Sequence, residues 1–282
     1  MSINDLLETV DDPNFISGIY NYCDRWCERC AFTTRCFLYA TERADPELDD
    51  PQVRDIDNAK FWRKLESIFK DTHELIAKWA AEAGIDLESF EVADATAERE
   101  DLRRDAKEHP LSLSARRYAE IVQHWFNEEF AVEVEVHDDV TGQSKSVEDD
   151  IDVTGAAEVI RWYQFFIAAK TYRALMGLED QRPDNDLAEV DVFTDNELSD
   201  DAIILRAAAD DSNGSAKIAL IGIDRSSSAW RVMQSSLPEK TDSIFPIMVE
   251  LGRLRQSLEE TFPNARDFLR PGFDEVGSDS MN

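Results

Sequence analysis

The chain has 282 residues, of which 60 are Asp or Glu and 30 are Lys or Arg, so its formal net charge at pH 7 is −30. A surface of this charge repels nucleic-acid phosphates and anionic lipid heads, both of which bind to basic patches. We therefore expect neither a nucleic-acid-binding protein nor one that binds membranes. A hydrophobic content of 43%, with six Trp and fifteen Phe, is typical of a folded chain with a sizeable core.

The acidity has three candidate origins that composition alone does not separate. It can keep the protein soluble, it can be an adaptation to high salt, or it can mark a docking surface for a basic protein partner. The second origin is suggested by the scarcity of Lys, with nine residues against 21 Arg.

The sequence predicts a cytoplasmic protein. Its first residues, MSINDLLETVDDPN, contain no basic stretch followed by an apolar run, so no signal peptide is expected. The most apolar window, 159–178, is interrupted by Arg161, Lys170 and Arg173, so no transmembrane helix is expected either. In the cytoplasm thiols stay reduced, and clustered cysteines there more often ligate metal than form disulfides.

Residues 1–57 are predicted to form an N-terminal arm in three parts. Residues 1–18 are a lead-in, residues 20–40 are rich in cysteine, and residues 42–57 form an acidic connector whose two prolines favour an exposed linker. The middle part holds every cysteine of the chain within fourteen consecutive positions: Cys23, Cys27, Cys30 and Cys36.

These four cysteines supply enough thiolates for an iron–sulfur cluster or a tetrahedral zinc ion. Structural zinc sites generally use two separated CxxC pairs, whereas here only Cys27 and Cys30 form such a pair. Three ligands on one loop with a fourth nearby are more typical of iron–sulfur ligation. We therefore favour an iron–sulfur cluster as the cofactor, with zinc as the alternative. A shared centre requires a bend near Cys27–Cys30, because an unbroken helix separates Cys23 and Cys30 by about 10 Å.

The neighbours of the cysteines fit a metal centre. The aromatic residues would exclude water, and the arginines would offset the negative charge of the thiolates. These residues are Tyr22, Trp26, Phe32 and Phe37, and Arg25, Arg29 and Arg35.

Two interpretations without a metal stay open. On a helix, Cys23, Cys27 and Cys30 share one face and would pack as small hydrophobic side chains; a disulfide is the other option, which the predicted compartment disfavours.

The spacing Cys23-x3-Cys27-x2-Cys30 also resembles the motif of radical S-adenosylmethionine enzymes. Those enzymes use a β/α barrel, and no alternating series of strands and helices follows here, which argues against that class.

From residue 58 the sequence becomes helical. A first helix is predicted from Asn58 to Ala83, with Gly84 as its stop. A second begins at Ser112 or Ser114. Their apolar stripes are Trp62, Leu65, Phe69, Ile76 and Trp79 in the first, and Tyr118, Ile121, Trp125 and Phe126 in the second. Alternating valines after Ala131 leave open one minor β-hairpin near 130–148.

The most hydrophobic helix is predicted from Ala156 to about Leu178, after a cap at Thr154, and its nearly complete apolar surface places it at the centre of the core. A further helix after Ser199 is expected to break at 213–214 and resume at Ser215. The last helix runs from about Asp242 to Thr261, with the stripe Ile247, Leu251, Leu254 and Leu258.

These elements predict an all-α fold: a multi-helix bundle with a cysteine-rich N-terminal segment. Three parts are expected in the chain, namely the arm at 1–57, the bundle domain at 58–274 and a disordered tail at 275–282.

Charged residues inside the predicted helices need partners, because unpaired buried charge is costly. We favour interhelical ion pairs for Arg161, Lys170, Arg173, Asp224 and Arg225. The alternative is a cationic pocket for an anionic small molecule.

Other chemical motifs are weaker. Glu120 and His124 lie one helical turn apart and are interpreted as solvated polar residues rather than a metal pair. The run that begins at His73 lacks the second histidine of the HExxH pattern, because residue 77 is Ala. The sequence contains no set of residues that we assign to catalysis, so the question of an enzyme stays open.

Two functional hypotheses follow. The first is a cytoplasmic acidic helical protein whose four-cysteine centre, most readily an iron–sulfur cluster, has a redox, sensing or regulatory role. The second is a non-enzymatic adaptor, in which zinc or metal-free cysteines staple the arm and the acidic surface docks a basic partner.

Overall fold

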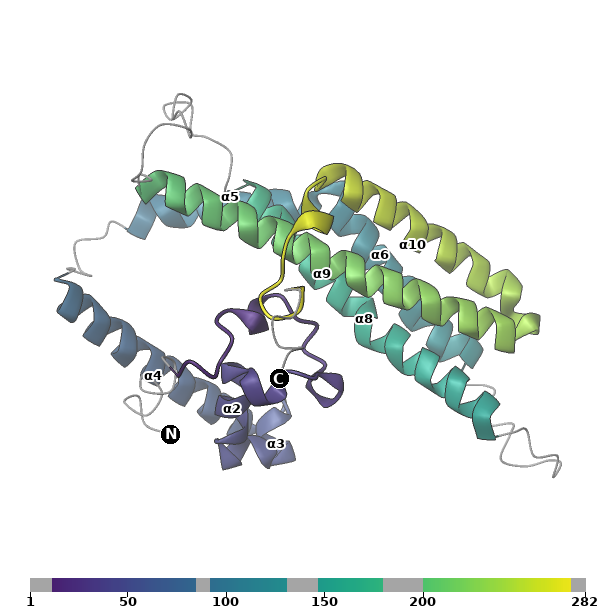
Figure 1. Ribbon diagram of the computed structural model, residues 1–282, viewed down its shortest axis with the longest axis horizontal. Helices are drawn as coiled ribbons and strands as arrows, with labels where there is room; N and C mark the ends of the chain where they lie inside the picture. The colour runs from purple at the N-terminus through teal and green to yellow at the C-terminus, as the bar shows by residue number, and fades with distance from the viewer. Residues whose placement is uncertain (1–11, 85–91, 131–146, 180–199, 275–282) are drawn as a thin grey trace, which may run out of the picture. The chain divides into compact units, whose positions relative to one another are not determined.

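Figure 1 shows the computed structural model, which describes residues 12–84, 92–130, 147–179 and 200–274. The regular elements in these ranges are all helical, which confirms the predicted all-α fold. Most of the region predicted as a hairpin, near 130–148, lies outside the described residues, and its two ends at Phe130 and Val147 are helical. The predicted tail at 275–282 lies outside them as well.

The chain forms two compact units, one of residues 1–98 with 269–282 and one of residues 99–268. The first unit is therefore built from both ends of the chain. The boundary that we predicted between residues 57 and 58 lies inside the first unit, between two of its helices.

The first unit consists of short turns followed by one long helix. Its elements are the 3₁₀ turns η1 (Ile19–Asn21), η2 (Cys27–Arg29) and η3 (Thr33–Arg35), then α2 (Phe37–Arg43), η4 (Pro46–Asp49), α3 (Pro51–Arg54) and α4 (Ala59–Ala83). Helix α4 confirms the predicted helix over 58–83: the Asn58 side chain accepts a hydrogen bond from the Lys60 N–H, and Gly84 ends the helix with a φ of 70°.

The predicted linker at 42–57 is instead a pair of capped helical turns. The carboxylates of Asp45 and Asp50 accept hydrogen bonds from the N–H groups of Glu47 and Gln52, at 3.1 and 3.0 Å. A proline follows each aspartate at the first helical position, where its missing N–H costs nothing and its fixed φ suits a helix. The prolines that suggested a linker therefore begin the turn η4 and the helix α3.

The second unit is a ring of four long helices. Its elements are α5 (Val92–Glu108, which enters the unit at Arg99), α6 (Pro110–Trp125), the π-helical turn η6 (Phe126–Phe130), α8 (Val147–Glu179), α9 (Asp200–Ser236), η7 (Pro238–Lys240), α10 (Thr241–Thr261) and η8 (Ala265–Asp267). Helix α8 packs along α9, α6 packs on α8 and α10, and α10 packs on α9. None of the described helices is long and apolar enough to cross a membrane.

Helix α6 begins earlier than predicted. The ring nitrogen Nδ1 of His109 accepts a hydrogen bond from the Leu111 N–H at 3.2 Å, and Pro110 occupies the first helical position. Ser112, which we expected as a cap, is buried inside the helix. A histidine cap was missed because the sequence rule favours Ser, Thr, Asp and Asn.

Helix α9 runs through Asn213 and Gly214 without the predicted break. Gly214 is buried at a level where α8 and α9 approach closely. The hydroxyl of Ser212 donates to the Ala174 carbonyl oxygen across the two helices at 2.9 Å, and a Cβ on Gly177 would lie 3.1 Å from the Ser212 Cβ. Packing of small residues thus overrides the weak local preference of Asn and Gly for a turn.

Aromatic residues join three helices of the ring. The indole N–H of Trp230 (α9) donates to the hydroxyl of Tyr118 (α6) at 3.2 Å, and that of Trp125 (α6) donates to the Ser243 hydroxyl (α10) at 2.9 Å. The rings of Trp125 and Trp230 meet edge to face at 5.0 Å. The predicted stripe of α10 is buried with them.

Helix α8 is not enclosed on all sides, contrary to its apolar sequence. Tyr163 and Ile167 are fully buried, whereas the side chains of Trp162 and Phe165 are 37% and 56% exposed. The helix contacts α6 and α9 within its unit, and two neighbours do not cover a whole helix.

Replacing Gly177 by Leu tests the close approach of α8 and α9. The new side chain would start 3.1 Å from the Ala208 carbonyl oxygen, which is backbone and cannot move aside cheaply. We expect the free energy of unfolding to fall by about 1–3 kcal/mol in urea titrations followed by far-UV circular dichroism. Gly252→Leu is the matched control, because nothing lies within 4 Å of its Cβ position and Leu favours helices. Equal stability of the two variants would contradict this packing.

The ionisation of Tyr118 makes the bundle sensitive to alkali. Burial raises the pKa of Tyr118 to about 12, from 10 in the unfolded chain. Between these values the folded state keeps a proton that the unfolded state has lost, so the free energy of unfolding falls as pH rises. Two pKa units correspond to about 3 kcal/mol. Titrations from about pH 9 to pH 12 should show a shallower fall for Tyr118→Phe than for the wild type; parallel curves would refute the assignment.

Candidate metal centre

The cysteine-rich segment folds as a series of turns rather than as a helix. Between η1 and η2 the backbone leaves the helical region, and Arg25 adopts a left-handed conformation with a φ of 59°. This conformation is uncommon for a residue with a Cβ, and it turns the chain between Cys23 and Cys27. The interpretation that placed Cys23, Cys27 and Cys30 on one helical face is therefore wrong, and the main turn lies just before the predicted place.

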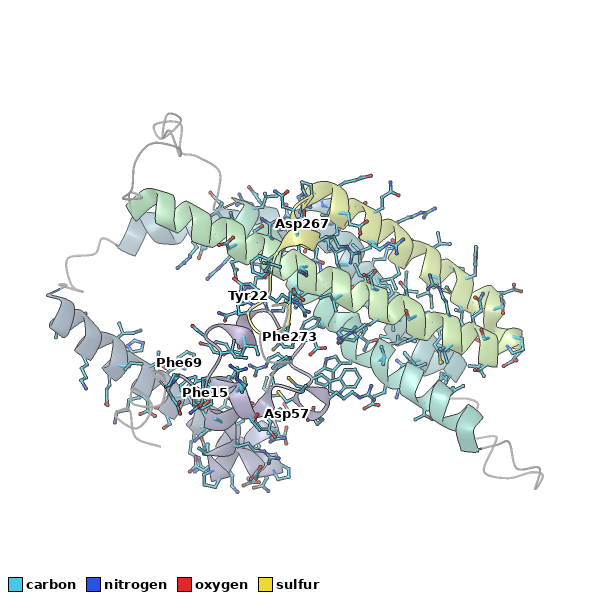
Figure 2. The ribbon with its side chains drawn as sticks, viewed as in Figure 1. Phe15, Tyr22, Asp57, Phe69, Asp267 and Phe273 are labelled. Carbon is cyan, nitrogen blue, oxygen red and sulfur yellow. The ribbon has the colours of Figure 1, made fainter. Side chains whose placement is uncertain are left out.

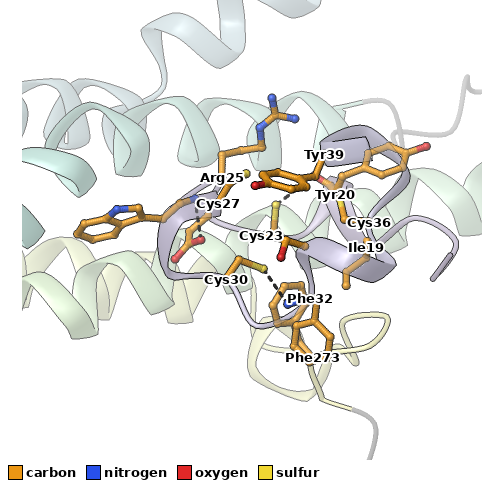
Figure 3. Close-up of a pocket in the computed structure, with 13 residues that line it drawn as sticks. Ile19, Tyr20, Cys23, Arg25, Cys27, Cys30, Phe32, Cys36, Tyr39 and Phe273 are labelled. Atoms are coloured by element: carbon orange, nitrogen blue, oxygen red, sulfur yellow. Dashed lines mark hydrogen bonds between the residues drawn. The ribbon is translucent and has the colours of Figure 1, made fainter. Parts of the chain in front are cut away.

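All four cysteines line one small cavity, which is drawn in Figure 3. Its volume of about 20 Å³ is enough for one or two waters. Each cysteine is half-buried, and the four come from the edges of three turns: Cys23 follows η1, Cys27 begins η2, Cys30 follows η2, and Cys36 follows η3. The rest of the lining is mostly aromatic, with Tyr20, Trp26, Phe32, Tyr39 and Phe273.

The hydrogen bonds of the sulfur atoms differ. The Sγ atom of Cys30 accepts a hydrogen bond from the Phe32 N–H at 3.4 Å. The Sγ atom of Cys23 instead donates to the Tyr20 carbonyl oxygen at 3.6 Å, which requires the protonated thiol. A backbone hydrogen bond from Arg25 also acts on Cys23 and lowers its pKa, so the backbone contacts the sulfurs of both cysteines.

Burial raises the pKa of the Cys23 and Cys27 thiols, because a thiolate loses solvation in the cavity. The positive charge of Arg25 acts in the opposite direction on both. The net result keeps the two sulfurs protonated at neutral pH. A metal that binds there must displace their protons.

The sulfur atoms do not converge to ligation distance. Within the described residues, no group of three or more His, Cys, Asp or Glu side chains is placed to hold a metal ion. The cysteines are nevertheless neighbours, since a charge on Cys36 raises the pKa of both Cys23 and Cys27. The donors thus suit a four-thiolate centre in type and number, and forming it requires the turns to move the Sγ atoms together.

The last described residues close one side of the cavity. The ring of Phe273 meets that of Phe32 edge to face, with centroids 4.9 Å apart (Figure 3). Gly272 before it has a φ of 74°, and a Cβ there would lie 2.8 Å from the Cδ1 of Ile16. Arg270 pairs with the Asp274 carboxylate at 2.8 Å. We call residues 270–274 the C-terminal clasp; its contact with the cysteine turns depends on glycine at position 272.

Only some of the aromatic residues that we predicted around the cysteines line the cavity. Trp26 and Phe32 line the cavity, whereas Phe37 packs against Phe15 with centroids 5.9 Å apart. Sequence reasoning missed Phe273, although the Pro–Gly pair before it signals a turn that directs the chain.

Of the three arginines, only Arg25 lines the cavity, and it pairs with Glu42 at 2.8 Å. Arg29 stacks over the Trp26 ring at 4.0 Å, and Arg35 donates to the Asn14 carbonyl oxygen at 3.4 Å.

A wider polar cleft lies beside the cysteine cavity. Its volume is about 560 Å³, and it shares Arg25, Cys27 and Tyr39 with the cavity. The other charged side chains around it are Glu28, Glu42, Arg43, Asp49 and Arg54. Cys27 therefore lies between the cysteine cavity and the polar cleft, and among the four cysteines it is the one that lines the cleft.

The charged residues predicted inside the bundle have partners within it. Arg173 binds the Asp211 carboxylate through two hydrogen bonds of 3.0 and 2.7 Å, and Asp224 pairs with Arg266 at 2.6 Å. The other three cations lie over aromatic rings: Arg161 over Phe126 at 4.4 Å, Lys170 over Phe166 at 5.6 Å, and Arg225 over Tyr163 at 5.8 Å. Arg173 and Asp224 thus form ion pairs, as we favoured, whereas the contacts described for Arg161, Lys170 and Arg225 are with aromatic rings; the anionic small molecule stays a prediction.

The weaker motifs lie on the surface. Glu120 and His124 are both exposed on α6, and His73 and Glu74 are exposed on α4. For Glu120 and His124 this exposure agrees with their interpretation as solvated polar residues.

No family model, curated protein or solved structure matches this chain. The functional argument therefore depends on the geometry of the cysteine cavity.

Loss of the clasp should expose the cysteines. We expect Phe273→Ala and Gly272→Ala to raise the rate at which the thiols of the metal-free protein react with a disulfide reagent several-fold, because accessible thiols react faster. Gly272→Ala acts through backbone strain and the clash with Ile16.

Leu269→Ala is the matched control for this experiment, since the Leu269 side chain is 69% exposed and lies just before the clasp. It should leave the rate unchanged. Rates that do not differ among the three variants would show that the clasp does not shield the cavity.

Proposed function

We propose that Cys23, Cys27, Cys30 and Cys36 form a four-thiolate metal centre, with an iron–sulfur cluster as its favoured occupant, and that this centre gives the protein a redox, sensing or regulatory role in the cytoplasm. One observation carries the proposal: every cysteine of the chain lines a single cavity. Four thiols from three successive turns do not meet by helical periodicity, so their gathering calls for a common ligand.

Three features support a cluster over zinc. The cysteines lie on one run of turns rather than on two opposed pairs. The backbone N–H of Phe32 binds the Cys30 sulfur, and hydrogen bonds of this kind tune cluster potentials. The aromatic lining limits the access of water to the sulfurs, which would protect a bound cluster. A bound cluster would supply one-electron chemistry.

The chain's own residues set the conditions for binding. Cys23 and Cys27 must each release a proton, which burial opposes. Arg25 lowers this cost from within the cavity wall, and the clasp residue Phe273 shields the bound group from water. Cys27 is the ligand that borders the polar cleft, and is therefore the one through which an oxidant or an exchanging thiol would first act.

A second candidate is an adaptor in which zinc or unliganded thiols staple the first unit. The separation of the sulfur atoms beyond ligation distance and the raised pKa of two thiols favour it. On this reading the function lies in the acidic surface, whose net charge of −30 suits a basic protein partner. Binding of such a partner would weaken steeply with added salt.

Metal content separates the two candidates. For the full chain purified without oxygen, we expect stoichiometric iron and acid-labile sulfide with visible charge-transfer absorption. Cys30→Ser should lose most of the iron, because it removes a ligand. Thr34→Ser is the matched control: residue 34 is an exposed residue of the same segment, and it should keep the iron.

The other outcomes decide against the cluster. Stoichiometric zinc without iron would support the staple. Protein that contains neither metal, and that stays colourless after anaerobic reconstitution with iron and sulfide, would refute the metal centre.

A further inference from the structure

Helix α4 presents a row of large apolar side chains to solvent. The exposed fractions are 55% for Trp62, 47% for Ile68, 59% for Phe69 and 47% for Ile76, and Phe69 is labelled in Figure 2. Single exposed apolar residues need no explanation, but a continuous row on one helix marks an interaction surface.

Among the described residues, the ion pairs and hydrogen bonds that join α4 to the rest of the first unit lie at its beginning. Helix α3 packs against α4. Lys60 pairs with Asp50 at 2.7 Å, Lys64 pairs with Asp45 at 2.6 Å, and the Trp62 indole donates to the Ile56 carbonyl oxygen at 2.9 Å. These contacts fix the first turns and leave Ile68, Phe69 and Ile76 outside them.

The apolar row follows a heptad repeat. The a positions are Trp62, Phe69 and Ile76, and the d positions are Leu65 and Thr72, with residue 79 as the next d. Spacings of alternately three and four residues over residues 62–79, about two and a half heptads, are typical of the seam of a coiled coil, which buries its a and d residues against a second helix. The helix spans 25 residues, enough for such a seam.

The distribution of charge along α4 favours an antiparallel partner, although Lys60 and Lys64 already pair with Asp50 and Asp45 within the chain. Four of its five basic residues lie in its first half, namely Lys60, Arg63, Lys64 and Lys70, and three of its four acidic residues lie in its second half, namely Asp71, Glu74 and Glu82. An antiparallel copy of the same helix brings the basic half of each opposite the acidic half of the other. A parallel copy would bring like charges together.

The antiparallel register also matches the apolar residues. With Trp62 opposite residue 79, Leu65 meets Ile76 and Phe69 meets Thr72 of the other copy. At the flanking g positions Ile68 meets Leu75. Each contact occurs twice, as two-fold symmetry requires.

The overall charge favours this helix as the place of self-contact. Two chains of charge −30 repel each other, whereas α4 contains more Lys and Arg than Asp and Glu. We propose that α4 pairs with α4 of a second copy of this chain in an antiparallel two-helix contact, which makes the protein a dimer. This proposal is independent of the metal centre.

The mass of the full chain in solution, measured by sedimentation equilibrium over a range of concentrations, tests the proposal. We expect a reversible dimer for the wild type. Phe69→Glu buries a charge in the seam and should weaken the dimer by at least about 100-fold. Phe165→Glu is the matched control, because Phe165 is 56% exposed on a helix of the other unit and should leave the dimer unchanged.

The orientation is tested by a double substitution. Residues 68 and 75 of two copies face each other only if the helices are antiparallel. The variant with both Ile68→Lys and Leu75→Glu should therefore dimerise more tightly than the sum of the changes in dimerisation free energy of the two single variants predicts. Far-UV circular dichroism confirms that each variant keeps its helices.

Three results would overturn the proposal. In the first, the wild-type chain stays monomeric at the highest concentration. In the second, the Phe69→Glu variant remains dimeric. The third is a monomer that binds vesicles of anionic lipid through α4, since the apolar row would then belong to a membrane contact.

Discussion

The return of the C-terminal clasp to the cysteine turns is the contact that defines the first unit. Gly272 lies against Ile16 and Ile19, and Phe273 lies against Phe32, so residues from the two ends of the sequence form one wall. The chain must traverse the whole helical unit before it can complete the cavity. Because the clasp depends on a left-handed glycine, a single Cβ at position 272 would act on the site without touching a cysteine.

In this acidic chain, many basic side chains pair with carboxylates. Many of the 30 Lys and Arg side chains have defined partners: Lys64 bridges Asp45 and Glu47, Arg173 binds Asp211, and Arg266 joins Asp224 to Glu259. Exposed pairs of this kind add little stability individually. Their effect is to fix the geometry of neighbouring elements in a chain where unneutralised carboxylates are abundant.

Thiol protonation links the metal centre to its surroundings. The cavity that would shield a cluster from water also raises the pKa of Cys23 and Cys27, so the same burial that protects the bound form opposes its assembly. Arg25 acts against this penalty at both Cys23 and Cys27. In the proposed metal centre the groups that favour deprotonation of the thiols prevail over burial, whereas in an adaptor with unliganded thiols burial prevails.

Local signals in the sequence determined much of the fold. Asn58 and Gly84 bound α4, and the period of Ile247, Leu251, Leu254 and Leu258 identified the buried face of α10, because caps and helical periodicity act over a few residues. The crowding of the four cysteines likewise identified the site that the structure gathers around one cavity.

Tertiary contacts decided the rest. Helix α9 continues through Gly214 because α8 lies close beside it, and Phe273 joins the cysteine cavity because the chain returns to its beginning. Packing between segments distant in sequence leaves no local pattern, so these two features had no signal that periodicity or spacing could provide.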